Sequence, residues 1–206
     1  VCLGGFSAKC IYPSYFKLLW NTATMTRFAK IQIHLHWLTL ILIAAVYAAM
    51  ELRGWFPRTS FAYATMKTLH YNLGIGVWIL MFIRLGLKHF YATPPIVPAP
   101  PRWQQQLATL MHMALYGAFL ALPLLGIAVL AYGETKWSFL GITIPPFITP
   151  DEDIQFMLKD IHETLANVGY FLIALHAGAA LFHHYIQKDT TLLRMMPGKG
   201  DPSPRR

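Results

Sequence analysis

The sequence has few charged residues: Asp, Glu, Lys and Arg make up 13% of its 206 positions. Soluble domains usually carry about 25%, and disordered chains are poor in hydrophobic residues, so both classes are excluded. Acidic residues are scarcest, with 9 Asp and Glu against 17 Lys and Arg, for a net charge of +8. A basic chain can bind nucleic acid, but 55% hydrophobic residues leave too little polar surface for a soluble basic domain. We therefore expect no nucleic-acid partner.

Cysteine is also scarce, occurring as Cys2 and Cys10 without metal-binding spacing. Both cysteines precede Met25, which begins a short basic lead into the first long apolar run. The residues upstream of Met25 contain no apolar run long enough for a secretory signal. We expect translation to start at Met25, which makes residues 1–24 an extension that is not native.

Long uncharged runs separate the charged residues. A membrane-spanning helix needs about 20 mostly apolar residues. Four runs are long enough, provided that Arg84, which interrupts the second run, extends its charged end to the membrane interface. The predicted spans are residues 31–50, 68–90, 106–131 and 162–186. The stretch Trp137–Pro150 is too short and rich in proline, so we expect an interfacial loop there. The predicted fold is an all-α integral membrane four-helix bundle over residues 25–197, followed by a polar tail at 198–206.

The charges are distributed unevenly between the two sides of such a bundle. If both termini lie on one side, that side carries 12 basic residues and the other carries 5. Because cytoplasmic loops are enriched in Lys and Arg, both termini are predicted to be cytoplasmic. The net charge is then +10 inside and −2 outside, so it reflects topology rather than a polyanionic partner.

The uncharged runs hold no carboxylate but several histidines, which disfavours a transporter of protons or metal ions. His162 and His176 are 14 residues apart, so they share one helix face and lie about 21 Å apart along the axis. This spacing places one imidazole near each edge of an apolar slab about 30 Å thick, as two stacked haems require. No Cys-x-x-Cys-His motif occurs, so any haem is predicted to be non-covalent haem b.

Each haem iron then needs a second ligand at the same depth on another helix. His70 begins its span from the outside and therefore lies level with His162. His36 begins its span from the inside and lies level with His176. His112 also begins a span from the inside, so it competes with His36 for the inner iron.

Four segments carry a resemblance to a known family. They are residues 162–185 with 188–197, His36–Trp37, Glu51–Arg58 and Thr93–Pro98. Together they closely resemble the bacterial cytochrome b561 family over about Met25–Pro197. The resemblance implies a four-helix membrane bundle with two b haems. It assigns His70 and His162 to one haem, and His36 and His176 to the other.

The resemblance also implies an activity. Superoxide would be oxidised to dioxygen at the outer side, and the electrons would pass through the haems to ubiquinone. The chain would then be a superoxide:quinone oxidoreductase that spans the bacterial inner membrane several times. Its partners would be superoxide, ubiquinone and the lipid bilayer, with no protein partner required.

Three basic residues lie near the outer haem level in the sequence: Arg53, Arg58 and Lys67. They are predicted to steer the superoxide anion and to pair with haem propionates, although each could also simply anchor the interface. The acidic run Asp151–Asp153 makes the outer face as a whole less positive, so the steering must be local to these residues.

At the inner side, quinone reduction consumes protons and needs a titratable donor. His183 lies seven residues after His176, on the same helix face and about 10 Å nearer the inner surface. We predict that His183 donates a hydrogen bond or proton to the quinone, while the adjacent His184 has an interfacial role.

Two other classes of function remain. The first is a cytochrome b subunit that passes electrons from a hydrogenase or other dehydrogenase to quinone, which copurification with a partner would reveal. The second is a transporter or structural protein that uses histidines without redox chemistry. A visible spectrum separates this class, because bis-histidine haem b gives sharp reduced bands.

Overall fold

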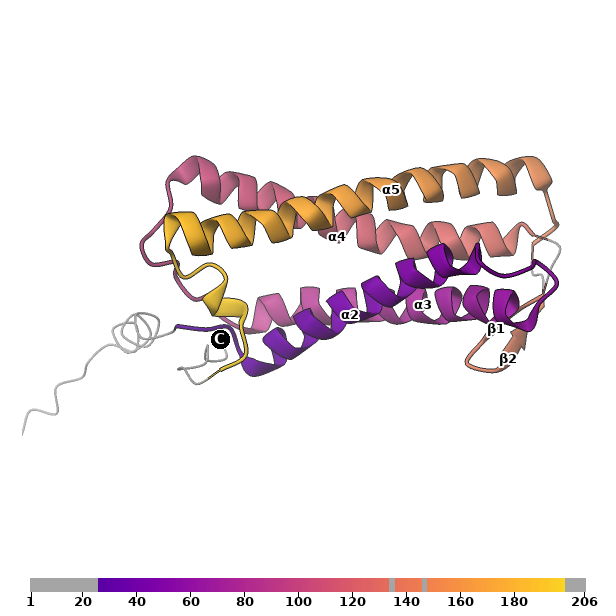
Figure 1. The fold of residues 1–206 in the computed structure, drawn as a ribbon, viewed down its shortest axis with the longest axis horizontal. Helices are drawn as coiled ribbons and strands as arrows, with labels where there is room; N and C mark the ends of the chain where they lie inside the picture. The colour runs from indigo at the N-terminus through magenta and orange to yellow at the C-terminus, as the bar shows by residue number, and fades with distance from the viewer. Residues whose placement is uncertain (1–25, 134–135, 146–147, 199–206) are drawn as a thin grey trace, which may run out of the picture.

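The computed structural model describes residues 26–133, 136–145 and 148–198. Within them lie four helices long and apolar enough to cross a membrane. They are α2 (Lys30–Arg53), α3 (Phe61–Phe90), α4 (Arg102–Ala131) and α5 (Glu152–Phe182) (Figure 1). The prediction of an all-α membrane four-helix bundle is confirmed. The extension at residues 1–24 and the tail after Gly198 lie outside the described residues.

The helices pack as two antiparallel pairs, α2 with α3 and α4 with α5 (Figure 1). A small apolar core formed by α2, α3 and α4 joins the pairs. Its buried members are Ile43, Val77, Met81, Phe119 and Leu122. Only 6% to 17% of the most apolar 18-residue window of each helix is buried. Most apolar side chains therefore face outward, as a surface in contact with lipid requires.

The chain after α5 folds back to the start of α2. It forms a π-helical turn, η1 (His183–Gln187), and a short 3₁₀ helix, η2 (Leu193–Met195). The Phe28 amide donates to the Arg194 carbonyl at 3.0 Å, and Trp37 Nε1 donates to the Met195 carbonyl at 2.9 Å. We call this end of the bundle the inner end and the opposite end, where α3 and α5 begin, the outer end, after the predicted topology (Figure 1).

Polar caps start two helices well before the predicted membrane spans. Ser60 Oγ accepts from the Tyr63 amide at 3.2 Å and caps α3. Asp151 Oδ1 accepts from the Ile154 amide at 3.0 Å and caps α5. Glu152 and the following Asp fill the first turn of α5, where negative charge favours the helix dipole. Hydropathy alone does not detect these polar first turns. The span predicted from residue 162 therefore begins later than α5 itself.

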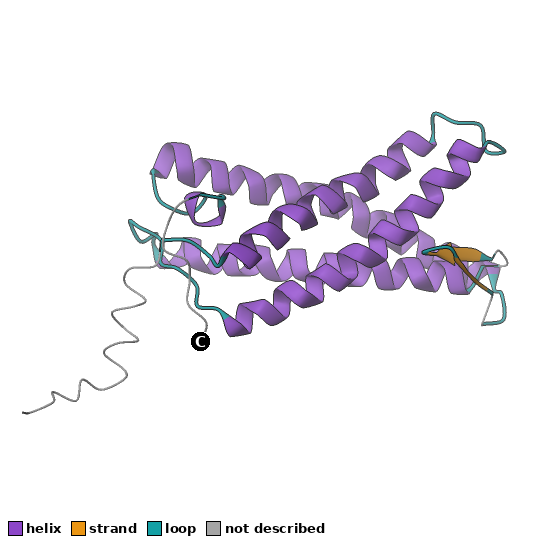
Figure 2. Cartoon of the chain, turned by 90° about the horizontal axis from the view of Figure 1, so that it is seen from below, coloured by secondary structure: helices purple, strands orange, loops and turns teal. Residues whose placement is uncertain are grey.

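The segment expected to be an interfacial loop contains a small hairpin at the outer end (Figure 2). Strands β1 (Trp137–Phe139) and β2 (Ile142–Ile144) pair antiparallel. The two residues that link them, Leu140 and Gly141, have φ values of 48° and 83°. Positive φ at both positions is typical of the tight two-residue turns that join strands with the normal twist.

Candidate functional site

The outer half of the bundle brings together two of the predicted histidines. His70 on α3 and His162 on α5 have ring centroids 6.1 Å apart, with ring planes at 72°. His70 Nδ1 lies 3.2 Å from the Val46 carbonyl oxygen. His162 Nδ1 is buried and faces the Leu122 carbonyl without a hydrogen bond of normal geometry. Gly126 on α4 leaves room for this ring, because a Cβ there would lie 3.3 Å from His162 Cε1.

The inner half holds three histidines rather than two. The His176 ring on α5 lies 6.3 Å from the His36 ring on α2 and 5.4 Å from the His112 ring on α4, measured between centroids. Arg84 on α3 donates to His36 Nδ1 at 3.0 Å. His112 Nδ1 lies 2.6 Å from the Ala108 carbonyl on its own helix. Both histidines that compete in the sequence therefore face His176.

These distances fit two imidazoles on opposite faces of one iron. A metal–imidazole bond is about 2 Å long and the ring centroid lies about 1 Å beyond the nitrogen, so the centroids should be about 6 Å apart. When Nδ1–H donates to a carbonyl, as at His70 and His112, the Nε2 lone pair is free for a metal. Among the described residues no group of three or more His, Cys, Asp or Glu could hold a free metal ion. Paired imidazoles suit a haem iron.

Other histidines lie away from these pairs. His34, two residues before His36, is exposed, so the two point in different directions as their spacing predicts. His89 is exposed at the end of α3. His184 packs against the ring of Tyr185, with centroids 4.8 Å apart.

His183 has a partner that the spacing rules do not identify. Its Nδ1 lies 2.5 Å from Asp189 Oδ2, with the two side chains 17% and 2% exposed. The Thr191 amide donates to Asp189 Oδ1 at 2.8 Å. Burial by itself raises the pKa of the Asp189 carboxyl, but the hydrogen bonds from His183 and Thr191 lower it below its ordinary value. The carboxylate is therefore ionised at neutral pH and orients the His183 ring.

The π-helical turn explains why this pair forms. Inside η1 the backbone bonds reach one residue further than in an α-helix, and Lys188 ends the turn with φ 55°. The Asp189 amide then donates to the His183 carbonyl at 3.2 Å. An Asp shortly after a predicted functional His was the only sequence signal for this contact.

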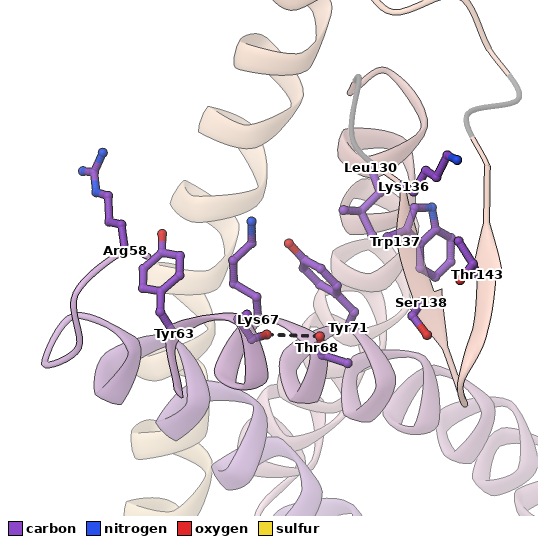
Figure 3. Close-up of a pocket in the computed structure, with 11 residues that line it drawn as sticks. Arg58, Tyr63, Lys67, Thr68, Tyr71, Leu130, Lys136, Trp137, Ser138 and Thr143 are labelled. Atoms are coloured by element: carbon purple, nitrogen blue, oxygen red, sulfur yellow. Dashed lines mark hydrogen bonds between the residues drawn. The ribbon is translucent and has the colours of Figure 1, made fainter. Parts of the chain in front are cut away.

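A cavity of about 390 Å³ lies at the outer end, between the start of α3 and the hairpin (Figure 3). Two of the three predicted steering residues, Arg58 and Lys67, line it. The third, Arg53, does not line it but lies beside it, with its guanidinium 5.6 Å from the centre of the Tyr63 ring. Lys136, just before β1, also lines the cavity. Its proximity to Lys67 depends on the folded hairpin, so the sequence alone does not indicate it.

The chain matches known proteins over nearly all of the described residues. The family model described as prokaryotic cytochrome b561 matches residues 27–198. "Cytochrome b561 homolog 1" of Escherichia coli is 64% identical over 173 residues, covering 84% of this chain and 98% of that protein. "Probable superoxide oxidase CybB" of Yersinia pestis is 42% identical over 173 residues, covering 84% and 97%. "Cytochrome b562" of Cereibacter sphaeroides is 27% identical, covering 82% and 94%.

Proposed function

The chain belongs to the prokaryotic cytochrome b561 family, and from this premise we propose that it is a superoxide:quinone oxidoreductase. The family consists of membrane cytochromes that bind haem b, and this member is a multi-pass protein of the bacterial inner membrane. In the proposed reaction, superoxide loses an electron at the outer end and ubiquinone is reduced at the inner end. The observation that carries the proposal is the pair of histidine sites, one beside a cationic pocket and the other near His183.

We assign two b haems to these sites. His70 and His162 would hold the outer haem iron, and His36 and His176 the inner one. His112 remains the competitor of His36, because its Nδ1 contact with a carbonyl leaves Nε2 free. His36 Nδ1 accepts from Arg84, so His36 would bind the iron through Nε2 only once its proton lies on Nδ1 and this hydrogen bond is released. When bound, the haems supply reversible one-electron transfer across the bilayer. The protein's part is to place the two imidazoles of each site on neighbouring helices at the same depth.

The topology belongs to the same proposal. Both termini would be cytoplasmic, so the inner end faces the cytoplasm and the outer end the periplasm. Residues 25–197 would form the functional domain, with residues 1–24 not native and 198–206 a polar tail.

At the outer end, Arg53, Arg58 and Lys67 would raise the local concentration of superoxide. The anion only has to come close enough to lose an electron, so no proton donor is required. The lining of the pocket by Arg58 and Lys67 supports their role, and Arg53 adds positive charge beside it. The predicted role for each is steering rather than bond formation.

At the inner end, two electrons from two superoxide ions and two protons convert one ubiquinone to ubiquinol. His183 would donate a proton from Nε2 to a quinone oxygen, since its Nδ1 is engaged by Asp189. The buried carboxylate holds the ring in the orientation that directs Nε2 away from Asp189 for this transfer. Reprotonation from the inner aqueous side would reset the pair.

The test is quinol formation by the purified protein, supplied with ubiquinone and an enzymatic superoxide source. We expect quinol formation that superoxide dismutase abolishes. We also expect His70→Ala or His162→Ala to remove one haem from the spectrum. Comparison of His36→Ala with His112→Ala identifies the inner ligand, because only the ligand's loss removes the second haem.

The alternative is a cytochrome b subunit that carries electrons from a hydrogenase or other dehydrogenase to quinone. The 64% identical relative is named for its family and not for an activity, which suits either role. A protein that shows both haems, forms no quinol from superoxide and copurifies with a dehydrogenase would establish this alternative.

A further inference from the structure

We propose that the β1–β2 hairpin is a selectivity element of the outer pocket. It places Lys136 opposite Arg58 and Lys67, so that the pocket favours small anions over cations. This inference rests on the proposed function in one respect, namely that electrons enter at the outer end. It adds the element and the residues that set the charge preference of that entrance.

The first observation is uncompensated charge in a concave site. Arg58, Lys67 and Lys136 all line the cavity of about 390 Å³, and none of its described lining residues is acidic. Across the described part of the chain, the one lysine or arginine with a carboxylate in ion-pair contact is Lys159, 3.2 Å from Glu163. Cations gathered in a hollow with low-dielectric walls focus the field and attract anions more than scattered surface charges do.

The second observation is the origin of these cations on separate elements. Figure 3 shows Lys67 rising from α3 and Lys136 beside the hairpin, on different sides of the pocket. The ring of Tyr71 lies between them in this view. Trp137, at the start of β1, lines the same cavity. The hairpin therefore forms one wall, and the residue just before it supplies one of the three charges.

The third observation is a clamp that holds this wall in place. Asn72 Nδ2 donates to the Ser138 carbonyl at 3.2 Å, and Asn72 Oδ1 accepts from the Leu140 amide at 2.7 Å. One side chain of α3 thus satisfies a donor and an acceptor of the hairpin, on β1 and at the turn. Because two bonds from one amide fix both distance and orientation, Lys136 is held relative to α3. We assign Asn72 as a positioning residue.

The haem's own propionates are the other anions that could neutralise this pocket. A haem carries two propionates, whereas the pocket has three cations, so one positive charge remains even if both propionates pair there. The holoprotein should therefore still prefer an anionic partner in solution. An anion preference that persists in the holoprotein would show that the pocket attracts a soluble anion and does not serve the propionates alone.

The experiment uses the purified, dithionite-reduced holoprotein in stopped flow. Ferrous haem passes one electron either to ferricyanide, an anion, or to hexaammineruthenium(III), a cation, and the haem bands report the rate. At low ionic strength we expect Lys136→Gln to slow the ferricyanide reaction about fivefold and to speed the hexaammineruthenium reaction. Both differences should disappear at about 0.5 M salt, where charges in water are screened within a few ångströms.

Lys159→Gln is the control for position, because it removes one positive charge from the outer end but outside the pocket, where Lys159 pairs with Glu163. It should leave both rates near those of the unmodified protein. Asn72→Ala should act in the same direction as Lys136→Gln, and the double variant should show no further loss. Equal rates for Lys136→Gln and Lys159→Gln would overturn the inference, whatever Asn72→Ala does. If superoxide forms no quinol while the ferricyanide preference depends on Lys136, the proposed function fails and this inference stands.

Discussion

Among single residues, Asp189 allows the most specific prediction. Its carboxylate contacts His183 at 2.5 Å and is almost fully buried. Asp189→Asn keeps the shape but removes the charged hydrogen-bond partner that orients His183. We expect quinol formation to fall about tenfold to 100-fold, with haem content unchanged. His184→Ala, which removes the neighbouring imidazole, should leave turnover near normal. A loss of haem in Asp189→Asn would instead indicate a structural role at the inner end.

The position of Arg84 leads to a prediction about the redox potential of the inner site. Its guanidinium nitrogen lies 3.0 Å from His36 Nδ1, within an apolar helix, and no carboxylate of the described residues is in ion-pair contact with it. A fixed positive charge next to a haem ligand favours the reduced form, because reduction adds negative charge. We expect Arg84→Gln to lower the midpoint potential of the inner haem by tens of millivolts. Arg84→Lys should retain most of the potential.

Spectroelectrochemical titration of the two proposed haems checks this prediction. The outer haem is the internal control, since Arg84 lies in the other half of the bundle. Equal shifts of both haems would mean that the substitution acts through the fold and not through local charge.

The residue scale also shows where inference from sequence stops. The histidine pairs could be predicted, because rigid helices of known rise turn a spacing of 14 residues into a depth in the membrane. Asp189 and Lys136 could not be placed in the same way. The first depends on a π-helical turn and the second on a hairpin with two residues at positive φ. Both contacts are made by irregular backbone, for which residue spacing gives no distance.

At the scale of elements, α4 contributes a surface for the outer site. Pro123 lies inside this helix, three residues before Gly126, whose missing side chain accommodates the His162 ring. Hydropathy predicted the span of α4, but it could not show which of its glycines faces a histidine. A Cβ at Gly126 would lie 3.3 Å from His162 Cε1, whereas a Cβ at Gly117 has no neighbour within 4 Å.

The two glycines therefore form a matched pair for mutagenesis. Gly126→Ala should displace the His162 ring, shift the reduced band of the outer haem and reduce its retention severalfold. Gly117→Ala should leave the spectrum unchanged and stabilise the helix by about 0.5–1 kcal/mol, as Ala for Gly usually does. Absorption spectra and haem content during prolonged dialysis provide the measurement. Identical behaviour of the two variants would show that Gly126 does not position the ring.

At the scale of the whole molecule, both histidine sites join the same two helix pairs. His36 and His70 belong to the α2–α3 pair, and His162 and His176 belong to α5. Because the apolar core between the pairs is small, a group bound by both sides would be a main contributor to their association. A ligand present at about 1,000 times its Kd stabilises the folded state by about 4 kcal/mol.

Removal of the ligands should therefore weaken the association of the pairs in steps. We expect His162→Ala to lose one haem and to lower the melting temperature, and the double variant with His176→Ala to lose both haems and melt lower still. Proteolysis of the segment between α3 and α4, residues 91–101, should accelerate in the same order, because this segment is the link between the pairs. His34→Ala, an exposed histidine on the same bundle, should change neither measurement. If all variants melted at the same temperature, packing alone would hold the pairs together, and the histidines would serve electron transfer without contributing to the fold.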